Sequence, residues 1–239
     1  MLVSPGDPPE RPRGEPTLAW FERVMRRGGG FRYSRRLVMG SGDPTERRRK
    51  LATLFAEAEA CTACSRMPGH PKTLGPQNGS VEARCLVIAT APGVEGSAAT
   101  GVPLRGDRAG TNFERLLASA GVRRERLFIT NALLCPPRTE AGRSRRPRRE
   151  ELRNCSRFVS GLIVQLAPAL VVTLGSTALA ALEQLAPHGL TLARDAGRPV
   201  RWMARWLLPL YHPGPRAMIH RTWGEQRRDY AMWRSLLED

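Results

Sequence analysis

Five cysteines are the residues in this chain of 239 amino acids whose spacing most clearly indicates chemistry. Cys61 and Cys64 form a C-x-x-C pair, and Cys135 and Cys155 follow further along the chain. Four thiolates suit either a zinc ion or a 4Fe-4S cluster, and ligand chemistry alone leaves both open. Cys85 begins an apolar run instead, so we predict that it is a buried thiol that binds no metal.

The basic composition indicates a polyanionic partner. The formal net charge is +16, and Lys or Arg side chains that neutralise phosphates gain affinity by releasing counterions. However, Lys50 and Lys72 are the only lysines, and this skew toward Arg indicates a compositional bias rather than selection for basicity. The charge therefore favours a nucleic acid as partner only if a site supports it.

No segment indicates a membrane or a secretory route. A run of about 18 apolar residues is absent, and residues 1–16 lack the apolar core of a signal peptide. We therefore expect a cytoplasmic protein that has no contact with membranes.

Strand-like and helix-like patterns alternate along most of the sequence. Residues 1–44 are rich in Pro, Gly and Arg, and we predict a flexible basic extension there, followed by a helix that Asp43 caps. Strands are predicted at 85–90, 127–134, 169–175 and 206–211, and helices at 111–121, 149–167, 176–186 and 223–237. The alternation predicts that residues 45–239 form one α/β domain, a three-layer sandwich with a central, mostly parallel sheet flanked by helices.

Polar loops follow the predicted strands at their carboxyl ends. Ala91-Pro92-Gly93 follows the first strand, Asn131 and a Cys-Pro-Pro segment end the second, and His212-Pro213 follows the last. Parallel sheets bind ligands at this edge, so we expect these loops to converge on one site.

From about residue 51 to the end, the ordered motifs resemble the iron–sulfur uracil-DNA glycosylases, families four and five of that superfamily. The segments that carry the resemblance are Cys61 and Cys64, Ala91-Pro92-Gly93, Thr100-Gly101-Val102-Pro103, Thr130-Asn131, Cys135-Pro136-Pro137, Cys155, Val172-Thr173-Leu174-Gly175 and His212-Pro213. The resemblance implies a uracil-DNA glycosylase-like fold, and a 4Fe-4S cluster on Cys61, Cys64, Cys135 and Cys155. It also implies a hydrolase of base excision repair that flips an aberrant base of DNA, above all uracil, and cleaves its N-glycosidic bond.

Details of the motifs are divided between the two families. Family four has an acidic residue where this chain has Thr90. Family five has instead an Asp in a G-D-x-x-G segment, which Asp107 matches, yet Asn131 is the choice of family four. The resemblance therefore implies a divergent relative of both.

Three side chains suit the chemistry that the resemblance implies. Cleavage gives the sugar oxocarbenium character and the departing base a negative charge, so donors are needed where that charge develops. His212 is expected to donate to the base oxygen, and Asp107 to orient the attacking water and stabilise the sugar cation. Asn131 is expected to match the edge of uracil and reject cytosine, with the backbone of Ala91-Pro92-Gly93 lining the same pocket.

Leu104 is the clearest departure from the resemblance. In these families a Phe follows the Pro of T-G-x-P, and its ring stacks on the flipped uracil, whereas here Leu104 follows Pro103. Stacking on an aromatic ring contributes about 1–3 kcal/mol per base, and a leucine recovers only part of this. We therefore expect slow uracil excision with a broadened or shifted range of bases.

Basic and apolar residues near the predicted site suit a DNA interface. After His212, Met218 and Ile219 are candidates for a wedge into the vacated base stack, and Arg216 and Arg221 are candidates for phosphate contacts. The insertion at 138–151 adds arginines that we expect to meet the DNA backbone: Arg145, Arg146, Arg148 and Arg149.

Other interpretations stay open at this point. The chain could be a glycosylase for another lesion, such as a deaminated purine or an alkylated base. It could also be a non-catalytic protein that binds damaged DNA, or a structural protein that contains zinc. We expect it to be a monomer.

Overall fold

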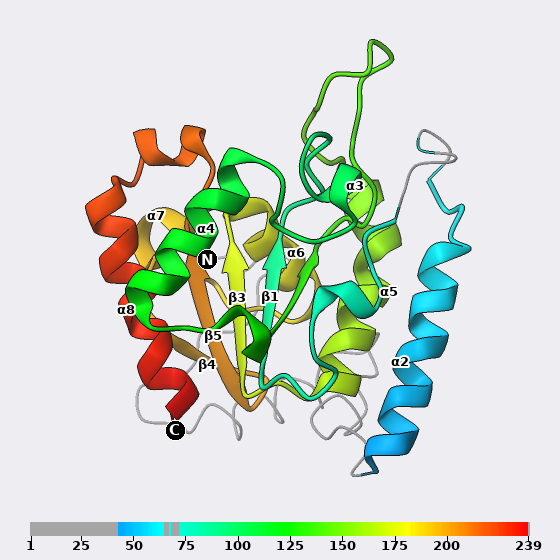
Figure 1. Cartoon of the computed structure of the whole chain (residues 1–239), viewed down its shortest axis with the longest axis horizontal. Coiled ribbons are helices and arrows are strands. Elements are labelled where there is room, and N and C mark those ends of the chain that lie inside the picture. The colour runs from blue at the N-terminus through cyan, green and yellow to red at the C-terminus, as the bar shows by residue number, and fades with distance from the viewer. Residues whose placement is uncertain (1–42, 65–66, 68–71, 239) are drawn as a thin grey trace, which may run out of the picture.

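The computed structural model describes residues 43–64, 67 and 72–238, and one five-stranded sheet lies at its centre (Figure 1). The strands lie in the order β2-β1-β3-β5-β4. Their bounds are Cys85–Ala89 (β1), Leu127–Asn131 (β2), Leu170–Leu174 (β3), Val200–Trp202 (β4) and Arg205–Leu210 (β5). Neighbouring strands are parallel except β4 and β5, which run antiparallel. The mostly parallel sheet is therefore confirmed.

Helices cover both faces of the sheet, which makes three layers (Figure 1). One face carries α2 (Pro44–Glu59), α5 (Arg149–Leu166) and α6 (Ser176–Leu185), and the opposite face carries α4 (Arg108–Ala120) and α8 (Trp223–Glu238). Every residue of β1, β2 and β3 is buried, as expected for a parallel sheet between helices. The predicted α/β sandwich is confirmed.

The helices form where the sequence places apolar residues on one side. In α4, Phe113, Leu116 and Ala120 are buried at helical spacing. Helix α2 begins after Asp43, whose side chain accepts a hydrogen bond of 2.9 Å from the backbone N of Thr45. The cap predicted at Asp43 is therefore confirmed.

The sequence did not predict the shortest elements, because each is too short to show a period. They are α3 (Ser97–Thr100), α7 (Leu192–Asp195), β4 and the 3₁₀ turns Pro76–Asn78, Arg124–Arg126 and Pro215–Ile219. Residues 1–42 lie outside the described residues, so the extension at 1–44 stays a prediction. In the part of the chain that is described, no helix combines the length and apolar character that crossing a bilayer requires.

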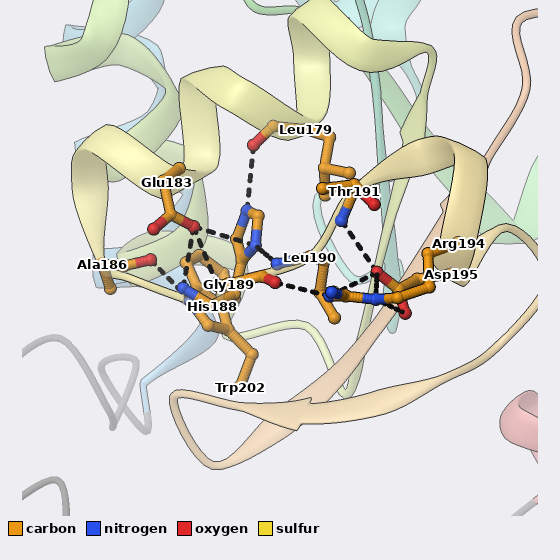
Figure 2. Close-up of polar contacts among 10 residues, drawn as sticks. All are labelled: Leu179, Glu183, Ala186, His188, Gly189, Leu190, Thr191, Arg194, Asp195 and Trp202. Carbon is orange, nitrogen blue, oxygen red and sulfur yellow. Dashed lines mark hydrogen bonds and ion pairs between the residues drawn. The ribbon is translucent and has the colours of Figure 1, made fainter. Parts of the chain in front are cut away.

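The segment between α6 and α7 is closed by its own polar contacts (Figure 2). The side chain of His188 is only 2% exposed, and its Nδ1 lies 2.9 Å from Oε2 of Glu183. The backbone N of Leu190 donates to the same Nδ1 at 3.0 Å, and Nε2 lies 3.0 Å from the carbonyl oxygen of Leu179. Glu183 also accepts hydrogen bonds from the backbone N of His188 and of Gly189. Both ring nitrogens of His188 are thus used inside the fold.

Candidate active site

The carboxyl ends of β1, β2, β3 and β5 bring the predicted loops to one edge of the sheet. Asn131 ends β2 beside the end of β1, whose chain continues into Thr90 and the loop 91–93. Gly175 follows β3 with a φ of +96°, and a Cβ there would lie 3.4 Å from the Cβ of His212 and 3.8 Å from Oγ1 of Thr90. Asn131, Thr90, Gly175 and His212 therefore lie along this edge in the order of the strands that carry or precede them, β2, β1, β3 and β5.

His212 offers one ring nitrogen to this edge, because its own loop binds the other. The backbone N of Gly214 donates to Nδ1 at 3.0 Å, so the proton of the neutral ring lies on Nε2. Within the described residues, no group hydrogen-bonds to Nε2. Burial lowers the pKa of His212 below its ordinary value of 6.5, and the charge of Asp107 opposes that shift. The ring is therefore neutral at neutral pH, with Nε2–H available as a donor.

Asp107 caps α4 with one carboxylate oxygen and directs the other toward the loop after β1. Oδ1 accepts a hydrogen bond of 2.8 Å from the backbone N of Gly110. A Cβ at Gly93 would lie 2.8 Å from Oδ2, and one at Gly96 would lie closer still, so a side chain at either position would have to displace the Asp107 carboxylate. A Cβ at Gly214 would lie 2.9 Å from Nδ1 of His212 and 3.9 Å from the Cβ of Ala109, so the His212 loop lies against the start of the helix that Asp107 caps.

Asn112 links α4 to the loop that carries His212, and the sequence did not single it out. Its Nδ2 donates to the carbonyl oxygen of Pro213 at 2.8 Å. This bond ties the helix that Asp107 caps to the loop that positions His212. A polar residue near the start of a helix gives no sequence signal of such a role, because such residues are usually solvated.

Asn131 is buried, and a segment that precedes β1 holds its amide. The side chain is 2% exposed, and Nδ2 donates to Oγ1 of Thr73 at 3.3 Å. Thr73 donates in turn to the carbonyl oxygen of Leu134, through its hydroxyl at 3.3 Å and its backbone N at 3.1 Å. Asn78 donates to the carbonyl oxygens of Thr73 at 3.1 Å and Ile129 at 2.6 Å. The sequence did not predict this contact between Thr73 and Asn131.

The loop after β1 and Leu104 lie beside the same edge. Pro92 is buried, whereas Ala91 and Gly93 are partly buried. Leu104 is 7% exposed and packs with the core under α4 and α8. Its φ of +50° is rare for a leucine, and its backbone N donates to Oγ of Ser97 at 3.0 Å. The loop backbone thus sets the position of Leu104, and its contact with a base stays a prediction.

Four of the five cysteines lie on one side of the sheet. Cys61 and Cys64 follow α2, Cys135 follows β2 and Cys155 lies in α5, and all four pack on the core between the sheet and helices α2, α5 and α6. Cys85 lies in the core on the opposite face, where burial strongly raises the pKa of its thiol. The fold therefore separates Cys85 from the other cysteines.

The two later thiols of this set are shifted in pKa, mainly by burial. Burial raises the pKa of Cys135 to about 11 and that of Cys155 to about 12, and the thiols of Cys61 and Cys64 contribute to both shifts. Among the described residues, no three or more His, Cys, Asp and Glu side chains are arranged to hold a metal ion, so a cluster on these cysteines stays a prediction.

The turn after His212 exposes an apolar side chain. Ile219 in the turn Pro215–Ile219 is 80% exposed, Met218 is partly buried and Arg216 is exposed. Arg221 differs, because its guanidinium binds the carboxylate of Asp229 through Nε at 2.9 Å and Nη2 at 2.6 Å. Arg221 thus braces the start of α8, and its charge is already paired within the fold.

The insertion between β2 and α5 projects from the same edge as a loop that Arg145 anchors (Figure 1). The guanidinium of Arg145 binds both carboxylate oxygens of Glu151, which is 4% exposed, and its Nε donates to the carbonyl oxygen of Arg138 at 2.8 Å. The charge of Arg145 is thus paired within the fold, and its contact with DNA stays a prediction. The same prediction stands for the exposed arginines of the insertion, Arg146, Arg148 and Arg149.

Comparisons with known proteins relate this arrangement to a family. The sequence model of the uracil DNA glycosylase superfamily matches residues 76–237. The type-4 uracil-DNA glycosylase of Thermotoga maritima is 30% identical over 168 residues, which cover 70% of this chain and 83% of that protein. The type-5 uracil-DNA glycosylase of Thermus thermophilus is 35% identical over 150 residues, which cover 56% of this chain and 63% of that protein.

Relatives of both types thus match, in agreement with the division of the motifs between families four and five. A further type-4 uracil-DNA glycosylase, from Archaeoglobus fulgidus, is 29% identical over 160 residues, which cover 65% of this chain and 75% of that protein. The chain belongs to the uracil-DNA glycosylase superfamily, whose members hydrolyse N-glycosidic bonds.

Proposed function

We propose that this protein is a DNA glycosylase that excises uracil in base excision repair. Its family and the names of its relatives, uracil-DNA glycosylases of types 4 and 5, support this proposal. The observation that carries it is the state of His212: Gly214 binds its Nδ1, and no group among the described residues binds its Nε2, in a loop that Asn112 ties to the helix capped by Asp107. Such a donor is what the departing base requires.

His212 would stabilise the negative charge that develops on uracil. As the bond between C1′ of the sugar and N1 of the base breaks, the electron pair moves to the base and spreads onto its O2. The Nε2–H of a neutral imidazole donates to that oxygen without giving up its proton, and the bond strengthens as the charge grows. The hydrogen bond from Gly214 keeps the ring in the tautomer that this step needs.

Asp107 would act on the opposite side of the breaking bond. Its negative charge stabilises the oxocarbenium character of the sugar, and the oxygen not used in the cap accepts a hydrogen bond from the attacking water. The water oxygen bonds to C1′, its proton passes to solvent, and uracil leaves as an anion that solvent protonates. The cap bond to Gly110 keeps the carboxylate in place during this step.

Asn131 and the loop after β1 would recognise the base. The Asn131 amide offers an acceptor for N3–H of uracil and a donor for O4, whereas cytosine has the opposite pattern at these positions. The backbone of Ala91-Pro92-Gly93 would line the same pocket. Leu104 would replace the stacking ring of relatives, so we expect slower uracil excision and tolerance of larger bases.

The exposed residues around the edge would flip the base and hold the DNA. Ile219 and the partly buried Met218 would fill the space that the flipped base leaves in the stack. Arg216 and the exposed arginines of the insertion, Arg146, Arg148 and Arg149, would bind phosphates. We further propose that the protein acts on DNA as a monomer in the cytoplasm.

Cys61, Cys64, Cys135 and Cys155 would hold a 4Fe-4S cluster. Such a cluster supplies a covalent link among the segments that its thiolates come from, here the end of α2, the end of β2 and the interior of α5. The amide of Asn154 donates to Sγ of Cys64 at 3.5 Å, the kind of contact that stabilises a cluster-bound thiolate.

Anaerobic purification followed by incubation with single lesions in short oligonucleotides tests the proposal. We expect brown protein that contains iron, and alkali-sensitive strands from DNA that contains uracil. Cys85→Ser should keep the colour, because Cys85 lies on the other face of the sheet. Cleavage only at hypoxanthine, xanthine or alkylated bases would mean that one of these bases, and not uracil, is the substrate. Gel-shift binding without any alkali-sensitive product would indicate a damage-binding protein, and stoichiometric zinc without iron would exclude the cluster.

A further inference from the structure

Thr73 lies outside every motif that identifies the family, yet it contacts the residue that would read the base. It is 1% exposed, and its Oγ1 accepts the hydrogen bond from Nδ2 of Asn131 at 3.3 Å. The two residues are separated by 58 positions in the sequence, so only the fold brings them together. In the proposed chemistry Thr73 takes no part in cleaving the bond, so its hydroxyl acts, if at all, through Asn131.

The hydrogen bonds of Thr73 favour one orientation of the Asn131 amide. A hydroxyl has one hydrogen to donate, and Thr73 directs it to the carbonyl oxygen of Leu134 at 3.3 Å. Its oxygen is then an acceptor, which suits the NH₂ end of Asn131 and repels the carbonyl end. Reversing the amide would require Thr73 to give up its bond to Leu134.

The backbone around Thr73 is held as firmly as its hydroxyl. Its N–H donates to the same Leu134 oxygen at 3.1 Å, and its carbonyl accepts from Nδ2 of Asn78 at 3.1 Å. Oδ1 of Asn78 accepts in turn from the backbone N of Gly75 at 2.8 Å. These bonds hold Thr73 in place, so the position of its hydroxyl relative to the Asn131 side chain is fixed.

We propose that Thr73 is a positioning residue that sets the amide orientation of Asn131 and thereby the preference for uracil over cytosine. The inference rests on the proposed function, in which Asn131 contacts the base. With NH₂ held at Thr73, the amide keeps its oxygen for N3–H of uracil and its second N–H for O4. Cytosine carries an acceptor at N3 and a donor at N4, so it matches only the reversed amide.

Thr73→Val tests the proposal, because valine keeps the shape and removes the hydroxyl. We expect kcat/KM for uracil to fall about two- to tenfold, the effect of one neutral hydrogen bond. Cytosine presented in the same oligonucleotide should not lose rate, so the ratio of uracil to cytosine excision falls. The pH profile should stay unchanged, because His212 is untouched. Thr73→Ser restores a hydroxyl and should restore both rate and selectivity.

A double-mutant cycle with Asn131→Ala shows whether Thr73 acts through Asn131. In single-turnover assays, Thr73→Val should have little further effect once the amide is gone. Three results would each overturn the proposal. They are the same loss of rate in the Asn131→Ala background, an unchanged ratio of uracil to cytosine excision, and equal losses in Thr73→Val and Thr73→Ser. Absence of uracil excision by the unmodified protein is a separate outcome, which would refute the proposed function instead.

Discussion

Two histidine loops of this protein differ in how completely the fold uses their rings. His188, between α6 and α7, has both ring nitrogens in contact with protein groups, and its side chain is 2% exposed (Figure 2). His212, after β5, has Nδ1 bound by Gly214 while, among the described residues, nothing binds Nε2. The first ring completes a local structure, and the second leaves one donor available at the edge where the strands end.

The comparison shows that the residue type alone does not distinguish a structural from a functional histidine. The surrounding segment does so, because it gives both ring nitrogens of His188 a partner, whereas the loop of the half-buried His212 leaves Nε2 available to a ligand. The same contrast divides the arginines. Arg145 and Arg221 are paired with Glu151 and Asp229, whereas Arg216 is exposed.

Removing the Nε2–H donor of His212 should have the largest effect on the rate of uracil excision. In His212→Ala, uracil excision should fall by about 10²–10³, the loss seen when one preorganised donor is removed. Thermal stability and DNA binding should change little, since the ring makes one hydrogen bond within the fold. His220→Ala is the matched control, because His220 is exposed in the same turn region. An equal rate in both variants would remove His212 from the chemistry.

Asp107→Asn should have the next largest effect on the rate of uracil excision, and it should also change the pH dependence of that rate. Asparagine still caps α4, so stability is retained, but the rate should fall on the order of 10² because the charge is lost. Excision requires neutral His212 and therefore declines as pH falls through its pKa. The charge of Asp107 raises that pKa, so removing it should move the acid limb of the kcat/KM profile to lower pH. A shift to higher pH would contradict the coupling.

His188→Ala should produce the opposite pattern to His212→Ala. The groups around this buried side chain lose their partners, so we expect the free energy of unfolding to fall by about 1–3 kcal/mol. Below the melting temperature of the variant, the rate of uracil excision should equal that of the unmodified protein. Urea unfolding and single-turnover assays on the same sample check both parts. A slower rate with unchanged stability would mean that this loop takes part in function.

The arginines should show the smallest effect on chemistry and a clear effect on binding. Replacing Arg146, Arg148 and Arg149 together by Gln should lower the slope of log affinity against log salt by about one for each phosphate that is no longer neutralised. Arg145→Gln serves as the contrast, because this change should weaken the anchor to Glu151 and lower stability instead. Fluorescence anisotropy across a salt series measures the slope. An unchanged slope would mean that these arginines are only solvated.

The sequence predicted the sheet and its edge well, because buried parallel strands are apolar runs and their ends carry polar loops. The second strand was predicted three residues too long, ending at 134, since an apolar run continues past Asn131 after the chain leaves the sheet. Cys85 was separated correctly from the other cysteines because it opens a buried strand.

The sequence did not predict the contacts that position the site. Asn112 reaches Pro213 across 101 residues, and Thr73 reaches Asn131 across 58. Both involve common polar side chains in segments without a motif, and hydrogen-bond partners depend on how distant loops pack. The pairing of Arg145 with Glu151 was missed for a different reason, because charge in an insertion indicates solvent or DNA unless the buried partner is known.

Identification of the released base tests the central claim most directly. Anaerobically purified protein is mixed in excess with a duplex that contains one uracil, and the small-molecule fraction is analysed by mass spectrometry. Hydrolysis of the N-glycosidic bond predicts free uracil and an intact strand with an abasic site, formed by the unmodified protein and His188→Ala but about 10²–10³ times more slowly by His212→Ala. No free uracil from protein that binds the duplex, or equal release by His212→Ala, would contradict the account.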